Sequence, residues 1–316
     1  MISLHLPVAH YRFSLQADSP VQLPAYAGSA WRGLFGNALK RSVCVTHEPD
    51  CRKCLLWRQC VYSYVFETPP PDRPDTILRH SSAVPHPFVI RPLATSGAKF
   101  ATGDLMTVEL VLVGRGNQHL PYIVHAFNVM GQTGIGKPDG YFHIAQLSRA
   151  DAEGGWQPVY NGQGSLTAQA PELLRFAEPE LCERVRLRFV TPYRSLQQGR
   201  LVQGGDFSAR QFLGTLLRRV SMLQAFHTEQ PLEADFKALS GLMETVQVAE
   251  NGLRWHDWAR YSSRQKTLIK MGGLLGEVEL RGEALAVFLP LLQAGEQVHV
   301  GKAAVMGLGE YRLDVI

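Results

Sequence analysis

One order of elements recurs along the chain, and this repeat restricts its fold more than any other feature. Alternating apolar residues indicate strands, and apolar residues three and four positions apart indicate helices. In the first half the order is strand, helix, strand, strand, helix, strand, at residues 2–17, 24–41, 61–66, 104–113, 121–130 and 141–147. In the second half strands at 184–190, 274–280 and 311–315 alternate with a helix that Ser208 can cap and a helix at 283–294. The chain is therefore predicted to be a degenerate duplication.

This repeated unit is the split βαβ or ferredoxin-like arrangement, in which two helices cover one face of a sheet. The predicted fold class is α+β, with two tandem ferredoxin-like (RRM-like, βαββαβ) domains. The chain has 316 residues, which is ample length for two cores. We expect a first domain over 1–150, a linker over 151–180 and a second domain over 181–316 that ends in a glycine-rich loop.

Four of the five cysteines lie between residues 44 and 60, with the spacing Cys44-x6-Cys51-x2-Cys54-x5-Cys60. Four thiolates can close a tetrahedral cage around Zn²⁺, and such a cage leaves no open position for catalysis. We therefore expect the first domain to contain a zinc-binding insertion. Cysteines without metal and a redox pair are the alternatives. This cysteine usage fits a reducing compartment better than a disulfide framework.

The end of the chain has a glycine-rich loop between two alternating segments, with Gly301, Gly307 and Gly309 beside Lys302 and Arg312. Glycines lack a Cβ, so a polyanion can approach the main-chain N–H groups, and the two cations add charge. The alternative is a plain glycine-rich hairpin. The spacing fits neither of the common nucleotide-binding fingerprints, and no helix follows the loop.

Positive charge is concentrated although the net charge is only +4. Arg184, Arg186 and Arg188 share one face of a strand because side chains alternate with period two. A second basic run, over 254–270, contains tryptophan and tyrosine residues among its cations. Such surfaces suit phosphate backbones and stacked bases, and a solvated charged face is the alternative. No apolar run could span a bilayer and the N-terminal residues lack a basic region followed by an apolar core, so we expect a cytoplasmic protein without membrane contact.

Several ordered segments together resemble the RAMP superfamily of CRISPR-associated proteins, and within it the family of endoribonucleases that process precursor CRISPR RNA. The matching segments are residues 23–36, the cysteine cluster through 67, 121–140, 260–265 with Gly272 and Gly273, and 299–312. The resemblance implies RNA cleavage without a catalytic metal. A ribose 2′-hydroxyl attacks the adjacent phosphate and leaves a 2′,3′-cyclic phosphate and a 5′-hydroxyl.

This chemistry needs a base, an acid and positive charge, which histidine, lysine and arginine can supply. The resemblance places the catalytic histidine just after the first helix, at His47. Lys53 or Lys40 would stabilise the phosphorane, and Tyr26 would orient the ribose. His47 as a zinc neighbour or a plain surface residue is the alternative. His10, His119, His125 and His299 compete for the catalytic role.

The expected RNA-binding residues combine the basic strips, the glycine loop and one cation of the first helix. They are Arg32, Arg184, Arg186, Arg188, Arg260, Tyr261, Arg264, Gly301, Lys302, Gly307, Gly309 and Arg312. The expected partners are CRISPR repeat RNA, as precursor and mature guide, and other CRISPR-associated effector subunits. A non-catalytic RNA-binding RAMP subunit and a zinc-stabilised assembly protein without an RNA role are the competing interpretations of the sequence.

Overall fold

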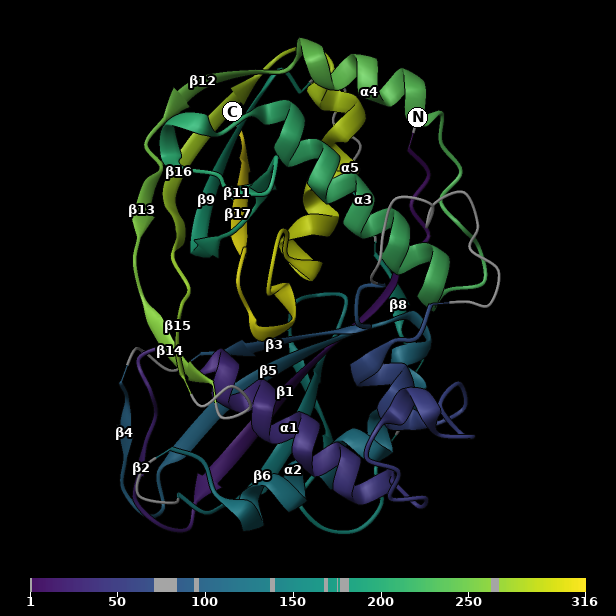
Figure 1. Ribbon diagram of the computed structural model, residues 1–316, viewed down its shortest axis with the longest axis vertical. Helices are drawn as coiled ribbons and strands as arrows, with labels where there is room; N and C mark the ends of the chain where they lie inside the picture. Colours follow the sequence, from purple (N-terminus) through teal and green to yellow (C-terminus); the bar gives the residue numbers. More distant parts are fainter. Residues whose placement is uncertain are drawn as a thin grey trace. The chain divides into compact units, whose positions relative to one another are not determined.

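A computed structural model describes residues 2–70, 84–93, 97–136, 140–167, 170–174, 176, 182–262 and 267–316 (Figure 1). The chain divides into two compact units, an N-unit of residues 7–172 and a C-unit of residues 173–316 together with 1–6. Both units combine helices with antiparallel sheets, as the α+β prediction requires. No helix in these ranges is both long and apolar enough to cross a lipid bilayer.

The sheet of the N-unit has the strand order β3-β5-β1-β6-β7, with β1 in the middle. Its elements are β1 (Pro7–Ala17), α1 (Gly28–Val43), β3 (Phe88–Pro92), β5 (Leu105–Val113), α2 (Leu120–Thr133), β6 (Phe142–Ala150) and β7 (Trp156–Tyr160). Of three short strands, β8 (Glu172–Leu173) pairs with β1, whereas β2 (Val21–Gln22) and β4 (Lys99–Phe100) pair with each other in a separate two-stranded sheet. The order from β1 to β6 follows the split βαβ pattern expected from the sequence.

Aromatic side chains join the two helices to one face of this sheet, where Figure 1 shows α1 and α2 side by side. Phe13 of β1 stacks on Phe127 of α2 with a ring-centroid distance of 3.9 Å, and Phe35 of α1 meets Phe88 of β3 edge-on at 5.4 Å. Gly131 allows α2 to lie directly on β6, because a Cβ there would overlap the carbonyl of Phe142. Close contact between α2 and β6 therefore depends on this one glycine.

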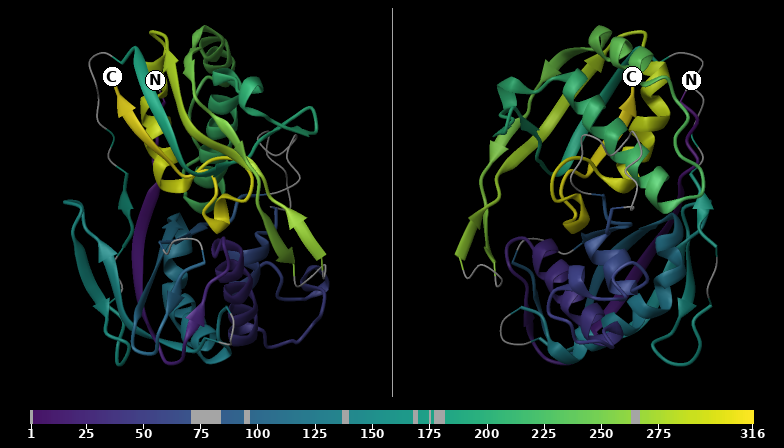
Figure 2. Two further views of the ribbon diagram at one scale, coloured as in Figure 1. Left: turned by 90° about the vertical axis from the view of Figure 1, so that its left-hand side faces the viewer. Right: turned by 45° about the vertical axis from the view of Figure 1, so that its right-hand side comes forward.

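The C-unit repeats the pattern with the strand order β12-β16-β9-β17. Its main elements are β9 (Arg184–Tyr193), α3 (Ala209–His227), α4 (Phe236–Thr245), β12 (Gln247–Asn251), β13 (Arg254–His256), β16 (Gly273–Arg281), α5 (Leu285–Val298) and β17 (Tyr311–Val315). Two hairpins, β10 (Leu196–Gln197) with β11 (Arg200–Leu201) and β14 (Ala259–Ser262) with β15 (Thr267–Lys270), complete it. Figure 2 shows α3 and α5 together on one face of the sheet.

Phe189 of β9 lies at the centre of the C-unit core. Its ring meets Phe212 of α3 at 6.0 Å and Tyr311 of β17 at 5.9 Å between centroids. The hydroxyl of Tyr311 donates to the carbonyl of Leu292 in α5 at 2.5 Å, which fixes that helix against the last strand. Ser208 caps α3 as the sequence predicted, because its Oγ accepts from the backbone N–H of Gln211.

Two segments differ from the sequence-based expectation. Residues 61–66 were expected to form a strand, but they are helical and continue as a π-helical turn at Ser63–Glu67. Tyr62 and Phe66 are four positions apart and stack at 5.6 Å, a pair that a helix brings together and a strand does not. Part of the expected linker, Trp156–Tyr160, is instead β7, which pairs with β6 at the sheet edge.

Candidate nucleic-acid interface

The glycines of the C-terminal loop are required by the loop's own backbone. Gly301 and Gly309 have φ values of 89° and 70°, in the left-handed region that favours glycine. A Cβ would overlap the carbonyl oxygen of Arg194 at Gly301 and that of Val300 at Gly309. The N–H of Lys302 donates to Arg194 at 2.8 Å and that of Gly309 donates to Pro192 at 3.1 Å. These two amides are therefore already used, contrary to the expected open phosphate cradle.

The base of the same loop is held by Arg219 of α3. Its guanidinium donates to the carbonyls of Val298 and His299 at 2.7 and 2.9 Å, which satisfies groups left open at the end of α5. Burial lowers the pKa of Arg219 to about 10, so it remains a cation at neutral pH. His299 is fully buried beneath the loop, which removes it as a surface catalyst. Lys302 remains exposed on the loop.

The arginine strip of β9 lies on one face, as alternation predicted, and it is paired with carboxylates. Glu279 is 4% exposed and contacts both Arg184 and Arg186. Hydrogen bonding from Arg184 lowers the pKa of Glu279, so the carboxylate is charged at neutral pH. Arg188 donates to Glu277 at 2.8 Å and is 55% exposed. The strip is thus a ladder of alternating charge, with the arginine side chains still half accessible.

Other expected RNA contacts have mixed surroundings. Arg312 of β17 is exposed and lies 3.3 Å from Glu310. The guanidinium of Arg32 on α1 stacks on the ring of Phe66 at 4.4 Å, which gives it a packing role within the N-unit. Arg260 and Tyr261 belong to β14. Arg264 lies outside the described residues.

The four expected catalytic residues are not brought to one place. Tyr26 precedes α1 and His47 follows it, and the 16 residues of this helix separate its ends by roughly 24 Å. Joint contact of Tyr26 and His47 with one scissile phosphate stays a prediction, which this separation disfavours. His47 is exposed at the other end, with a left-handed φ of 54°. Lys53 is exposed in the same segment, and Lys40 lies 5.6 Å above the ring of Tyr62.

A second group of titratable residues lies at the end of β1, where sequence reasoning considered His125 and missed Asp18 and His143. Nδ1 of His143 lies 2.7 Å from Oδ1 of Asp18, and both side chains are about half exposed. They line a hollow of about 660 Å³ together with His125 and Asn128 of α2. A carboxylate that orients an imidazole leaves its other nitrogen free for proton transfer. The two residues are 125 positions apart, so only strand pairing brings them together.

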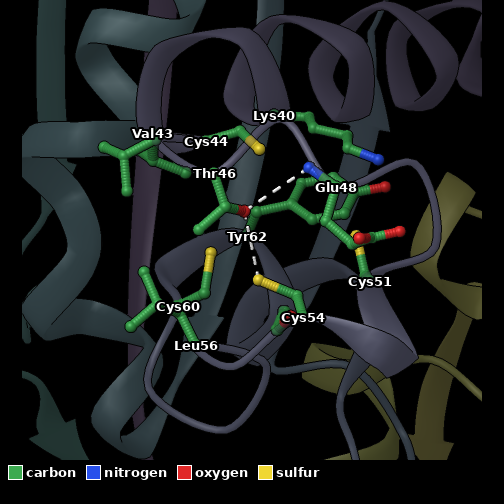
Figure 3. A pocket seen from close by; sticks show the side chains of 12 residues that line it. Lys40, Val43, Cys44, Thr46, Glu48, Cys51, Cys54, Leu56, Cys60 and Tyr62 are labelled. Atoms are coloured by element: carbon green, nitrogen blue, oxygen red, sulfur yellow. Dashed lines mark hydrogen bonds between the residues drawn. The ribbon is translucent and has the colours of Figure 1, made fainter.

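The four cysteines surround one small cavity of the N-unit, of about 20 Å³ (Figure 3). Cys44 ends α1, Cys51 and Cys54 flank a short turn, and Cys60 precedes the helical segment at 61–67. All four are free thiols of intermediate exposure. Sequence spacing therefore identified a group that the fold does collect.

Two family models match successive parts of the chain. Residues 6–172 match the AF_1859_N N-terminal domain, and residues 187–311 match the CRISPR-associated endoribonuclease Cas6. An uncharacterised protein of Archaeoglobus fulgidus is 26% identical over 172 residues, which are 54% of this chain and 56% of that protein. The chain thus spans little more than half the length of this relative.

Solved Cas6 structures share the fold. Thermus thermophilus Cas6 has a TM-score of 0.55 at 17% identity, covering 99% of this chain and 100% of its own. A Cas6 product complex has a TM-score of 0.57 at 18% identity, covering 98% and 99%. A partial Cas6-RT-Cas1–Cas2 complex has a TM-score of 0.60 at 13% identity, covering 100% and 47%. Residues 187–311 thus match the family of CRISPR-associated Cas6 endoribonucleases, and the chain as a whole shares the fold of solved Cas6 structures.

Proposed function

We propose that this protein is an endoribonuclease that cleaves CRISPR repeat RNA and releases mature guide RNAs. The observation that carries this proposal is the match of residues 187–311 to the Cas6 model. One similar structure is a Cas6 product complex, which supports an RNA substrate for this chain as well. We also propose a cytoplasmic location and contact with other CRISPR-associated subunits; a partial Cas6-RT-Cas1–Cas2 complex that shares this fold supports the contact.

The proposed reaction is a metal-independent transesterification. The ribose 2′-oxygen forms a bond to phosphorus while the bond from phosphorus to the 5′-oxygen breaks. A base takes the 2′-hydroxyl proton, and an acid gives a proton to the leaving oxygen. The products are a 2′,3′-cyclic phosphate and a 5′-hydroxyl. A nearby cation would stabilise the charge on the phosphorane.

Two histidines are candidates for the proton transfers. His47 is the residue that the resemblance points to, and Lys53 or Lys40 would supply the charge. Its exposure and its position in the loop that also carries Lys53 support this assignment. His143 is the competing candidate, because Asp18 orients its ring as a catalytic base requires. Since they lie in different parts of the N-unit, single substitutions can separate them.

We propose that the C-unit contributes to RNA binding through exposed cations. The half-exposed arginines of β9 and the exposed Lys302 and Arg312 support a surface that follows the phosphate backbone. The carboxylates of Glu277 and Glu279 pair with these arginines and reduce the net positive charge of the strip. This favours contacts with specific phosphates over non-specific attraction of RNA. Electrostatic binding of this kind weakens as salt rises, in proportion to the number of phosphates contacted.

The decisive experiment is cleavage of a labelled CRISPR repeat RNA in excess EDTA, with the wild-type protein beside His47→Ala and His143→Ala. A substrate with 2′-deoxyribose at the cut site removes the nucleophile and should resist cleavage. His5→Ala, an exposed histidine outside both candidate groups, is the matched control. A cut with a cyclic phosphate end that one of the two variants abolishes would identify the base. Tight binding with no cut by any protein would favour a non-catalytic RNA-binding subunit.

A further inference from the structure

We propose that Cys44, Cys51, Cys54 and Cys60 bind one structural Zn²⁺ ion in the N-unit. Three separate elements bring these cysteines to one cavity. The end of α1 supplies Cys44, the turn at Cys51–Lys53 supplies the pair Cys51 and Cys54, and the entry to the helical segment at 61–67 supplies Cys60. No element contributes more than one cysteine except the turn, which has the two-residue spacing found in many zinc knuckles.

The turn between Cys51 and Cys54 is already shaped for ligation. Asp50 caps it through a hydrogen bond from the N–H of Arg52 at 3.1 Å, and the N–H of Cys54 donates to the carbonyl of Cys51 at 3.2 Å. Leu55, directly after the turn, is 86% exposed. No residue from Cys44 to Cys60 is buried, so no apolar core fixes this segment. A metal would hold this segment where burial does not.

The cavity suits a single ion. Its volume of about 20 Å³ is close to that of one water-sized sphere, too small for an organic ligand. Val43 and Leu56 shield it on the apolar side, and Lys40 lies on its wall. The hydroxyl of Thr46 lies 3.2 Å from Sγ of Cys54, and a hydroxyl near a thiolate is a common outer contact that orients the sulfur.

Ligation requires the cysteines to turn inward. As they stand, no three histidine, cysteine, aspartate or glutamate side chains in the described ranges are arranged to hold a metal. Zinc–sulfur bonds of about 2.3 Å would bring neighbouring sulfurs to about 3.8 Å. Rotation about χ1 by one staggered position moves a sulfur by about 3 Å, so side-chain rotation is of the right size. Protonated thiols do not favour this arrangement, which forms when they lose their protons and bind the metal.

The net charge of the proposed zinc centre gives a reason for Lys40 to line the cavity. Four thiols that bind one Zn²⁺ form four zinc–sulfur bonds and release four protons, which leaves the centre with a net charge of −2. Lys40 offsets part of this charge from the same cavity. With four sulfur ligands the ion has no open position, so its role is to fold the segment at 44–60 and not to activate water.

Zinc would also fix the loop that carries His47 and Lys53, since both lie between the ligands in sequence. This consequence rests on the proposed function, whereas binding of the metal does not. Loss of zinc is expected to weaken RNA cleavage by releasing these two side chains, if His47 is the base.

The test measures metal without RNA. The purified full-length protein is analysed for bound zinc, and Co²⁺ is then titrated into zinc-free protein to record the spectrum of a tetrahedral thiolate complex. Cys51→Ser combined with Cys54→Ser removes two ligands. Cys182→Ala is the matched control, because Cys182 is a buried cysteine of the C-unit.

We expect one zinc per chain in the wild-type protein and in Cys182→Ala, and at least a tenfold loss of affinity in the double variant. If the double variant does not fold, the cobalt spectrum of the wild-type protein decides alone. Absence of that spectrum, retention of full affinity by the double variant, or a thiol titration that reveals a disulfide would overturn the proposal. Zinc content after EDTA treatment shows whether a loss of cleavage arises from the structural ion or from the nuclease assignment.

Discussion

Replacement of Gly309 by alanine separates the two roles that glycines of the C-terminal loop can have. If Gly309 serves only to admit a phosphate, Gly309→Ala should leave the free protein unchanged and weaken RNA binding. If it serves the loop's own backbone, the free protein should be destabilised. The positive φ of 70° and the overlap of a Cβ with the carbonyl of Val300 favour the second outcome.

The expected magnitude follows from the contacts. A residue with a Cβ in the left-handed region costs roughly 1–2 kcal/mol. Relief of the overlap must displace Val300, whose N–H donates to the carbonyl of Gly309 at 3.1 Å. It must also disturb the bond from Gly309 to Pro192 at 3.1 Å, and each bond contributes about 1 kcal/mol. The substitution should therefore lower the free energy of unfolding by about 3–4 kcal/mol, a large share of typical domain stability.

The assay is equilibrium unfolding in denaturant without RNA, with Gly214→Ala as the matched control. Gly214 lies within α3, and a Cβ there would meet only the sulfur of Met243 at an ordinary 3.9 Å. This control should be stabilised by up to about 1 kcal/mol, because alanine favours helix. Wild-type stability in Gly309→Ala, combined with weaker RNA binding, would refute the structural explanation and restore the phosphate-cradle hypothesis.

Three further predictions follow from the charged groups. Burial lowers the pKa of His10 to about 4 from 6.5, so the folded state disfavours the charged ring. The free energy of unfolding should therefore fall by about 1–3 kcal/mol as the pH is lowered from 6.5 to 4. His10→Gln should flatten this pH profile. Arg219→Met should destabilise the free protein by about 2–4 kcal/mol in denaturant unfolding, because the carbonyls at the end of α5 lose their donor. Lys302→Ala should change the free energy of unfolding by no more than about 0.5 kcal/mol, because Lys302 is exposed. It should reduce the slope of log K for RNA binding against log salt concentration by about one. An unchanged slope would place Lys302 outside the interface.

Periodicity alone predicted most of the repeated element order, because side-chain alternation and helical spacing are local properties of the chain. It predicted the central strands, the cap at Ser208 and the shared face of the arginines in β9. The prediction of a strand at 61–66 was wrong, because this segment is helical and stacks Tyr62 on Phe66. Residues four positions apart share one face of a strand as well as of a helix, so this short aromatic segment is ambiguous in sequence.

The sequence by itself determined the two-fold order of elements, the basic strips and the cysteine cluster, since each is a matter of spacing along the chain. Only the tertiary structure decided what those residues face. Glu279 and Arg186 are far apart in sequence and meet because β9 pairs with β16. Asp18 and His143 meet because β1 pairs with β6. Tyr26 and His47 are close in sequence and are separated because a rigid helix lies between them, a distance that only folding fixes.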